Sequence, residues 1–233
     1  MISVCMATYN GESYIKEQIE SILPQLRDCD ELIVSDDGST DQTLEIIFSF
    51  ECEKVKILHG PRNGLIKNFE NAINAAKGDY IFLCDQDDVW LENKVNVFKA
   101  AFENGADLIV SDCHVVDSGA KVINESFFSL RNSRVGFCCN LLRNGFLGCC
   151  MAFKAELKPK VLPFPKNIPM HDWWIGLVAS LHGEVVFINQ PLILYRRHGN
   201  NASPTGDKSS FSLMTQAAHR ISLCFYLMKG YFK

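Results

Sequence analysis

The first half of the chain alternates between two spacings of its hydrophobic positions. Short continuous apolar runs are each followed by a polar turn and by a segment whose apolar residues recur at helical spacing. The runs predict strands over Ile2–Thr8, Glu31–Ser35, Val55–His59, Tyr80–Cys84 and Asp107–Val116. The segments between them predict helices over Glu12–Leu26, Leu44–Phe50, Phe69–Ala76 and Glu92–Asn104. This alternation predicts an α/β fold with a Rossmann-like, mostly parallel sheet and helices on both faces.

The second half of the chain has a less regular pattern. In order, it predicts a loop with short helices over residues 118–144, a strand in Gly145–Phe153, a helix over Trp173–Leu181, and two strands, Glu184–Ile188 and Leu192–Tyr195. Asp172 is expected to be the N-cap of the helix that follows it. From Ser209 to Lys233 the chain is basic and rich in aromatic residues. Such a helix lies on an anionic membrane surface, or it packs against its own domain or a partner subunit.

Composition narrows the class of protein. The chain has 233 residues, 47% hydrophobic and 21% charged, which is ordinary for one globular domain with one core. A net charge of -4 without a basic stripe argues against nucleic acid as a partner. No apolar run reaches the roughly 18 to 20 residues of a spanning helix. Because no leader segment precedes the first strand, we expect the protein in the cytoplasm.

The ten cysteines are expected to be reduced in such a compartment. We interpret them as mostly buried small apolar residues. The pairs Cys138-Cys139 and Cys149-Cys150 suggest zinc as an alternative, but adjacent cysteines lack the usual two-residue gap between ligands.

Three carboxylates follow the predicted strand Tyr80–Cys84, namely Asp85, Asp87 and Asp88. Such a cluster is costly unless a cation lies beside it. Mg²⁺ and Mn²⁺ prefer carboxylate oxygens and bind substrate phosphates at the same time, so the cluster predicts a metal–diphosphate site. The alternative is an acidic N-cap, in which the dipole of the next helix favours Asp88.

Polar clusters also follow the first two predicted strands. Thr8-Tyr9-Asn10 follows the first strand and Ser35-Asp36-Asp37 follows the second. The carboxyl ends of parallel strands meet at one edge of a sheet, where α/β folds bind their ligands. All three clusters are therefore expected around one site.

Several further motifs occur in order along most of the chain. They include Ser35-Asp36-Asp37-Gly38-Ser39-Thr40-Asp41, Asn63-Gly64 with Asn68-Phe69, Gly78-Asp79-Tyr80, Asp85-Gln86-Asp87-Asp88-Val89-Trp90, His171-Asp172 and Arg197-His198-Gly199-Asn200-Asn201. Together they resemble the family 2 glycosyltransferases, inverting enzymes of the GT-A fold. The acidic motif and the Arg-His-Gly-Asn-Asn ending are most similar to bacterial rhamnosyltransferase-like members that act in O-antigen or capsule synthesis.

The resemblance implies a role for each donor-side residue. Thr8, Tyr9 and either Asp37 or Asp36 would hold the nucleobase, and Asn63 and Asn68 would line the donor pocket. Asp85 would contact the ribose or the water shell of the metal, and Asp87 would bind Mn²⁺ or Mg²⁺.

On the acceptor side, the resemblance makes Asp172 the catalytic base, although family members often have Glu-Asp where this chain has His171-Asp172. A buried N-cap is the alternative role for Asp172. His198 would complete the metal shell or contact the diphosphate, although a single histidine is as easily structural.

The resemblance also implies a domain plan and a function. Residues 1–206 would form one GT-A domain, with a nucleotide-sugar-binding half (1–117) and an acceptor-binding half (118–206), followed by an amphipathic helical tail (207–233). The enzyme would move one sugar from dTDP-rhamnose or a UDP-hexose to an acceptor hydroxyl. The basic, aromatic tail further predicts a lipid-linked oligosaccharide as the acceptor, at the inner face of the membrane, with peripheral membrane contact through the tail. The alternative is a non-catalytic nucleotide-sugar-binding or assembly subunit with the same fold.

Overall fold

The structure is a computed structural model that describes residues 1–199, 201 and 212–231. Three sequence predictions fall wholly or partly outside these residues. They are Asn200 of the Arg-His-Gly-Asn-Asn motif, the boundary at residue 206, and the two ends of the predicted tail, Ser209 and Lys233.

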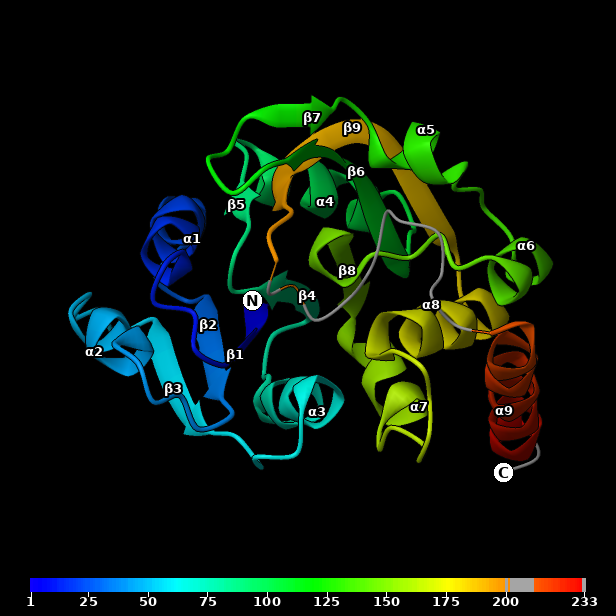
Figure 1. The fold of residues 1–233 in the computed structure, drawn as a ribbon. Helices are drawn as coiled ribbons and strands as arrows, with labels where there is room; N and C mark the ends of the chain where they lie inside the picture. Colours follow the sequence, from blue (N-terminus) through cyan, green and yellow to red (C-terminus); the bar gives the residue numbers. More distant parts are fainter. Residues whose placement is uncertain (200, 202–211, 232–233) are drawn as a thin grey trace.

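Among the described residues, nine strands form one curled sheet (Figure 1). Its order is β3-β2-β1-β4-β8-β6-β9-β5, with β7 paired to β6. The strands are β1 (Ile2–Thr8), β2 (Glu31–Asp36), β3 (Val55–His59), β4 (Tyr80–Asp85), β5 (Val89–Trp90), β6 (Leu108–Val116), β7 (Val122–Asn124), β8 (Met151–Lys154) and β9 (Val185–Arg196). β3, β2, β1 and β4 are parallel, as are β6 and β9, whereas β8 runs antiparallel between β4 and β6. The predicted α/β class is confirmed.

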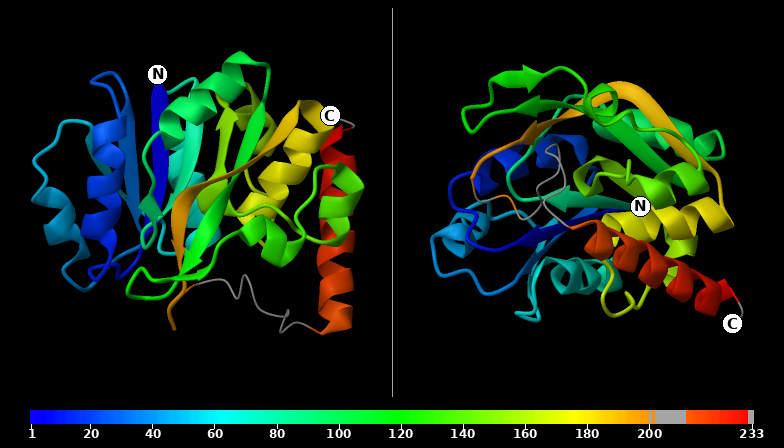
Figure 2. Two further views of the ribbon diagram at one scale, coloured as in Figure 1. Left: turned by 90° about the horizontal axis from the view of Figure 1, so that it is seen from above. Right: turned by 45° about the vertical axis from the view of Figure 1, so that its right-hand side comes forward.

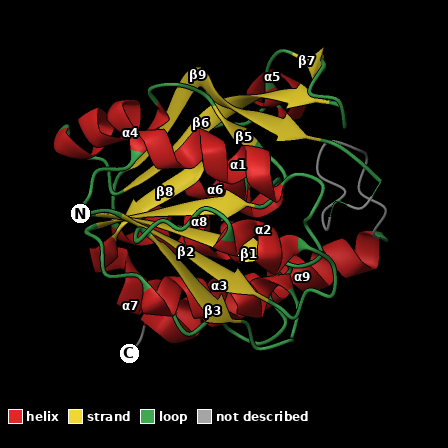
Figure 3. Cartoon of the chain, turned by 90° about the vertical axis from the view of Figure 1, so that its left-hand side faces the viewer, coloured by secondary structure: helices red, strands yellow, loops and turns green. Residues whose placement is uncertain are grey.

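Helices cover both faces of this sheet (Figure 3). The α-helices are α1 (Ile15–Ile22), α2 (Thr43–Phe48), α3 (Leu65–Ala75), α4 (Lys94–Glu103), α5 (Phe127–Arg131), α6 (Phe137–Leu142), α7 (Lys158–Val161), α8 (His171–His182) and α9 (Leu213–Tyr231). The 3₁₀ turns are η1 (Leu23–Gln25), η2 (Gly148–Cys150) and η3 (Ala155–Leu157). α1 and α4 lie on one face, and α3, α7 and α8 lie on the other. Figure 2 shows α9 on the outside of the molecule, beside α8.

Burial on both faces explains why the first strands are continuous apolar runs. Every residue of β1 and β2 is buried, as expected for parallel strands that helices cover on both sides. From β1 the chain moves outward to β2 and β3 and then returns to pair β4 with the other side of β1. The carboxyl ends of β1, β2 and β4 therefore flank the point where the strand order reverses, which is where α/β sheets bind ligands.

Three local predictions in the second half were wrong. The two strands predicted over Glu184–Ile188 and Leu192–Tyr195 form the single strand β9, because the residues between them are accommodated by a register shift against β6. The strand predicted in Gly145–Phe153 is shorter, since η2 precedes β8. The N-cap of α8 is Met170, and Asp172 lies in the first turn of the helix instead.

All ten cysteines are free thiols. Only five of them are buried, so the expectation of mostly buried cysteines was wrong. Cys138 and Cys139 are exposed, whereas Cys149 and Cys150 are buried. Across the described part of the chain, no helix combines the length and the hydrophobicity that crossing a membrane requires.

Candidate active site

A cavity of about 340 Å³ opens at the carboxyl ends of β1, β2 and β4. Its walls come from both halves of the chain. Among the residues that line it are Thr8, Tyr9, Asp37, Asn68, Asp85, Gln86, Asp87, Leu147, Gly148, His171, Asp172, Tyr195 and Asn201. The polar clusters that follow three separate strands in the sequence therefore do surround one space.

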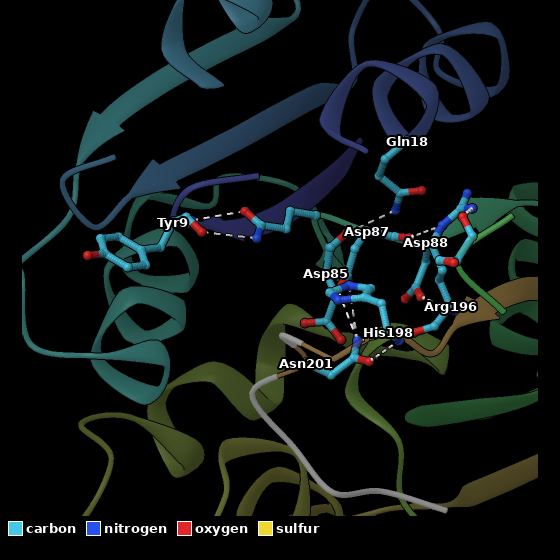
Figure 4. Close-up of polar contacts among 10 residues, drawn as sticks. Tyr9, Gln18, Asp85, Asp87, Asp88, Arg196, His198 and Asn201 are labelled. Carbon is cyan, nitrogen blue, oxygen red and sulfur yellow. Dashed lines mark hydrogen bonds and ion pairs between the residues drawn. The ribbon is translucent and has the colours of Figure 1, made fainter. Parts of the chain in front are cut away.

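Asp87 is held by two side chains from beyond the end of β9 (Figure 4). His198 Nε2 lies 2.8 Å from Asp87 Oδ2, and Asn201 Nδ2 donates to the same oxygen at 3.1 Å. The side chains of Asp87 and His198 are only 14% and 13% exposed. A carboxylate and an imidazole are thus gathered at the edge of the cavity.

Asp85 lies beside this pair on the cavity wall. Its pKa is raised above the ordinary value, first because the carboxyl is buried and then because Asp87 and Asp172 are negatively charged neighbours. A divalent cation between these groups would relieve that repulsion. Carboxylate oxygen and imidazole nitrogen are both ligands of Mn²⁺, so the chemistry of Asp85, Asp87 and His198 suits such a cation, although their ligand atoms do not all lie within 4.8 Å of one another.

Asp88 faces the protein interior and is 1% exposed. Its Oδ1 accepts a hydrogen bond from the backbone N–H of Arg196 at 2.9 Å. The alternative in which Asp88 caps the following helix is wrong, since α4 begins at Lys94 with Asn93 as its N-cap. Among the described residues, one set of three ligand atoms lies within 4.8 Å of one another, from Asp85, Asp88 and Cys149. A thiol is a poor ligand for Mg²⁺, so this buried set suits a hard cation less well than the cavity edge does.

Asp36 was predicted as one of two candidates to bind the nucleobase, but it does not line the cavity. Its carboxylate accepts hydrogen bonds from Thr8 Oγ1 at 3.0 Å, from Ser39 Oγ at 2.5 Å and from the backbone N–H groups of Gly38 and Ser39. The side chain is buried and closes the turn after β2. Of these two neighbouring aspartates, Asp37 is the one that lines the cavity.

Asp37 is fixed by the loop that precedes α3. Its carboxylate accepts from the backbone N–H of Gly64 at 2.8 Å and from that of Asn63 at 3.3 Å. Asn63 thus acts through its backbone and does not line the cavity. The side-chain amide of Asn68 donates to the carbonyls of Thr8 at 3.2 Å and Ser35 at 2.8 Å, which joins α3 to the ends of β1 and β2.

The ring of Tyr9 is 56% exposed at the mouth of the cavity. In Figure 4 it points away from Asp85 and Asp87. The Tyr9 backbone forms two hydrogen bonds with the side-chain amide of Gln86, at 2.9 Å and 3.1 Å. Gln86, inside the acidic motif, therefore joins the loop after β1 to the loop after β4.

Asp172 lines the same cavity from the first turn of α8 and is 5% exposed. Its Oδ2 accepts from the backbone N–H of Gly148 at 3.2 Å. Burial raises the pKa of Asp172 to about 6, and hydrogen bonds from the backbone N–H groups of Trp173 and Gly148 limit the rise. The group is ionised near neutral pH but basic enough to accept a proton.

His171, the neighbour of Asp172, is buried against Phe69, with ring centroids 4.0 Å apart and nearly parallel planes. Burial lowers the pKa of His171 to about 3. The imidazole is therefore neutral at physiological pH, and it adds no charge beside Asp172.

Some contributors to the site were not predicted. Gln86 and Asn201 are adjacent to predicted residues within the motifs, and their position there was a usable signal. Gly148, in η2, and Leu147, its N-cap residue, line the cavity. The apolar pattern of their segment predicted a strand, and it gave no indication that these two residues would line the cavity.

Comparison with known proteins identifies the class. The model of the protein family "Glycosyl transferase family 2" matches residues 3–159, about two thirds of the chain. The chain belongs to this family and is a glycosyltransferase. It is 32% identical to dTDP-rhamnosyl transferase RfbG of Shigella flexneri, over 84% of this chain and 72% of RfbG. This resemblance confirms the similarity to rhamnosyltransferases that the motifs indicated.

Two further proteins extend the comparison. The chain is 24% identical to UDP-Glc:alpha-D-GlcNAc-diphosphoundecaprenol beta-1,3-glucosyltransferase WfgD of Escherichia coli, over 89% of this chain and 81% of WfgD. The crystal structure of S. aureus TarS 1-349 in complex with UDP superimposes with a TM-score of 0.68 at 23% identity, over 84% of this chain. The chain spans 60% of that TarS fragment. The fold is of the GT-A type.

Proposed function

We propose that this protein is a metal-dependent inverting glycosyltransferase that moves one sugar from a nucleotide diphosphate sugar to an acceptor hydroxyl. The observation that carries the proposal is the arrangement around one cavity, in which Asp87 and His198 lie 2.8 Å apart and Asp172 lines the same cavity as Asp87. A cation at Asp87, Asp85 and His198 would neutralise the leaving diphosphate.

The residues of this chain divide the reaction between them. Asp172 takes the proton of the acceptor hydroxyl while the acceptor oxygen forms a bond to the anomeric carbon. The bond from that carbon to the diphosphate oxygen breaks on the opposite face, and the diphosphate leaves with the electron pair. Asp37 holds the nucleobase by accepting a hydrogen bond from its ring N–H, and Thr8 and Tyr9 flank it.

The donor is proposed to be dTDP-rhamnose or a UDP-hexose. Support comes from the names of the relatives, since RfbG is a dTDP-rhamnosyl transferase and WfgD uses UDP-Glc. Residues 1–117 would form the donor-binding half and residues 118–206 the acceptor-binding half. The motif Gln-x-x-Arg-Trp of processive synthases is absent from the sequence, so we propose the addition of one sugar per binding event.

The acceptor is proposed to be a lipid-linked oligosaccharide in bacterial O-antigen or capsule synthesis. WfgD acts on a diphosphoundecaprenol-linked sugar, as its name states. We propose that the protein works in the cytoplasm, at the inner face of the cell membrane, where such an acceptor can reach the cavity.

Helix α9 supplies a surface for this contact. Its exposed face carries Met214, Ile221, Phe225 and Met228, at 85%, 69%, 55% and 57% exposure. Successive spacings of seven, four and three residues place them on one side of the helix. Leu223 and Leu227 are buried, so the helix is docked by its other side.

The charges of α9 favour an anionic membrane surface as the partner of this face. The helix contains Lys229 and Arg220 and no acidic residue, and the Arg220 guanidinium donates to the carbonyl of Leu142 on the docked side. Apolar side chains flanked by cations are typical of helices that lie in the interface of an anionic bilayer.

The proposed function is tested by assaying transfer from dTDP-rhamnose, UDP-galactose, UDP-glucose and UDP-N-acetylglucosamine to an undecaprenyl-diphosphate-linked sugar, with Mn²⁺ and with chelator. We expect transfer from one donor, dependent on metal, with inversion at the anomeric carbon by NMR. Transfer with retention, or none from any donor despite donor binding, would contradict the proposal.

A further inference from the structure

Arg196 is buried directly behind the cavity edge, at 3% exposure. Its guanidinium donates hydrogen bonds to three separate segments, at the carbonyls of Asp87 (2.8 Å) and Ser118 (2.9 Å) and at Glu17 Oε2 (2.5 Å). Its backbone N–H donates to Asp88 Oδ1. One residue therefore holds the acidic loop after β4 at two points (Figure 4).

The first helix connects the same arginine to His198. The guanidinium carbon of Arg196 lies 4.8 Å from the centroid of the Tyr14 ring, and the His198 ring stacks on Tyr14 at 4.9 Å. Tyr14 is the N-cap residue of α1, and Glu17 lies in its first turn. Both groups that fix Arg196 on this side thus belong to one rigid element.

We propose that Arg196, Tyr14 and Glu17 form a positioning clamp that sets the distance between Asp87 and His198 and so fixes the affinity of the site for its divalent cation. This inference rests on the metal site in the proposed function. Asp87 and His198 are 111 residues apart in the sequence. Both lie in loops, outside the β-sheet hydrogen bonding of β4 and β9. The clamp adds a constraint to the one that Asn201 provides through its hydrogen bonds with Asp87 and His198.

The chemistry of arginine is needed for this role. A planar guanidinium donates in fixed directions to several acceptors at once, whereas a lysine ammonium is a single point charge on a flexible stem. Arg196 does not line the cavity, so it acts through Asp87 and His198 and does not touch the substrate.

The test compares Mn²⁺ binding by wild type, Arg196→Lys and Glu17→Gln, measured by the electron paramagnetic resonance signal of free Mn²⁺, with and without UDP. Glu20→Gln is the matched control, since Glu20 lies one turn along α1 and pairs with Lys16, at 3.9 Å on the surface. Changes behind a metal ligand typically cost about 10 to 100-fold in affinity. We expect about a tenfold loss in Arg196→Lys, a smaller loss in Glu17→Gln, and none in Glu20→Gln.

Two readouts separate positioning from general stability. The Mn²⁺ concentration for half-maximal turnover is expected to rise in Arg196→Lys while kcat recovers at saturating Mn²⁺. Glu17→Gln is expected to keep the wild-type melting temperature in chelator and still bind Mn²⁺ more weakly. Wild-type Mn²⁺ affinity in both variants would overturn the clamp alone. Absence of Mn²⁺ binding by the wild-type protein would instead overturn the metal site, and the clamp with it.

Discussion

His198 Nε2 lies 2.8 Å from Asp87 Oδ2, although the two residues belong to different halves of the chain. Asp87 follows β4 and His198 follows β9, so the pair forms only when both loops reach the same edge of the cavity. This relationship makes the proposed cation site a product of the whole domain, and the site is expected to be sensitive to changes in either loop.

His198→Ala is predicted to weaken Mn²⁺ binding by about tenfold or more, since one of three candidate ligands is removed and Asp87 loses its partner. His182→Ala, at the end of α8, is the control and should bind Mn²⁺ like the wild type. Titration calorimetry with Mn²⁺ measures both. Equal affinity in the two variants would exclude His198 from the metal site.

Asp172→Asn is predicted to lower kcat by about 10² to 10⁴-fold, because an amide cannot accept the acceptor proton. Donor affinity should stay within about twofold of wild type, as Asp172 acts on the acceptor side. Asp28→Asn, on a fully exposed side chain, controls for general effects. A variant that keeps full turnover would show that Asp172 has only a structural role.

The pH dependence of turnover follows from the pKa of Asp172, which burial raises from 3.8 to about 6. A general base works in its deprotonated form. The rate should therefore be constant above this pKa and fall about tenfold for each pH unit below it. A profile of kcat/KM against pH measures this, and a rate that stays level down to pH 4.5 or so would contradict the role of Asp172.

His171 predicts a second pH effect, on stability. Its pKa is lowered from 6.5 in the unfolded chain to about 3 in the fold. Stability from this residue is thus complete above 6.5 and declines as the pH falls from 6.5 towards 3. The loss approaches about 1.4 kcal/mol for each pH unit.

His171→Phe keeps an aromatic ring against Phe69 and removes the titration. Denaturant unfolding from pH 7.5 to about pH 5 should show a smaller loss of stability in this variant than in wild type. Identical pH dependence in the two proteins would mean that His171 does not titrate in this range.

The membrane proposal predicts that Ile221→Glu with Phe225→Glu abolishes binding to vesicles containing phosphatidylglycerol. Both side chains lie on the exposed face of α9 and would place charge in the bilayer interface. Ile123→Glu is matched in chemistry and exposure, at 58%, and lies on β7, far from α9 (Figure 1). Cosedimentation measures binding. A concentration-dependent dimer that the α9 changes disrupt, without vesicle binding, would indicate a second copy as the partner.

The sequence predicted the parts of the site that follow from strand order. Asp85, Asp87 and Asp37 come directly after predicted parallel strands, and parallel strands bring their carboxyl ends to one edge. The gathering of these residues around one cavity therefore required only the alternation of apolar runs and helical spacing.

Contacts across long separations could not be predicted in the same way. Arg196 and Glu17 are 179 residues apart, and periodicity carries no information on such a pair. Asp36 and Asp37 are adjacent and chemically identical, so only the geometry of the turn decides that Asp36 faces inward and Asp37 faces the cavity. The sequence pattern predicts two strands where the structure has the single strand β9. The polar residues at its register shift against β6 look like a turn in the sequence.

The proposed reaction requires a cation, held by Asp87, that binds the diphosphate of the donor. Titration calorimetry of UDP and dTDP with wild type and Asp87→Asn, each with Mn²⁺ and with chelator, tests it most directly. We expect nucleotide binding by the wild-type protein that depends on Mn²⁺ and is lost in Asp87→Asn. Equal binding with and without metal, in both proteins, would contradict it.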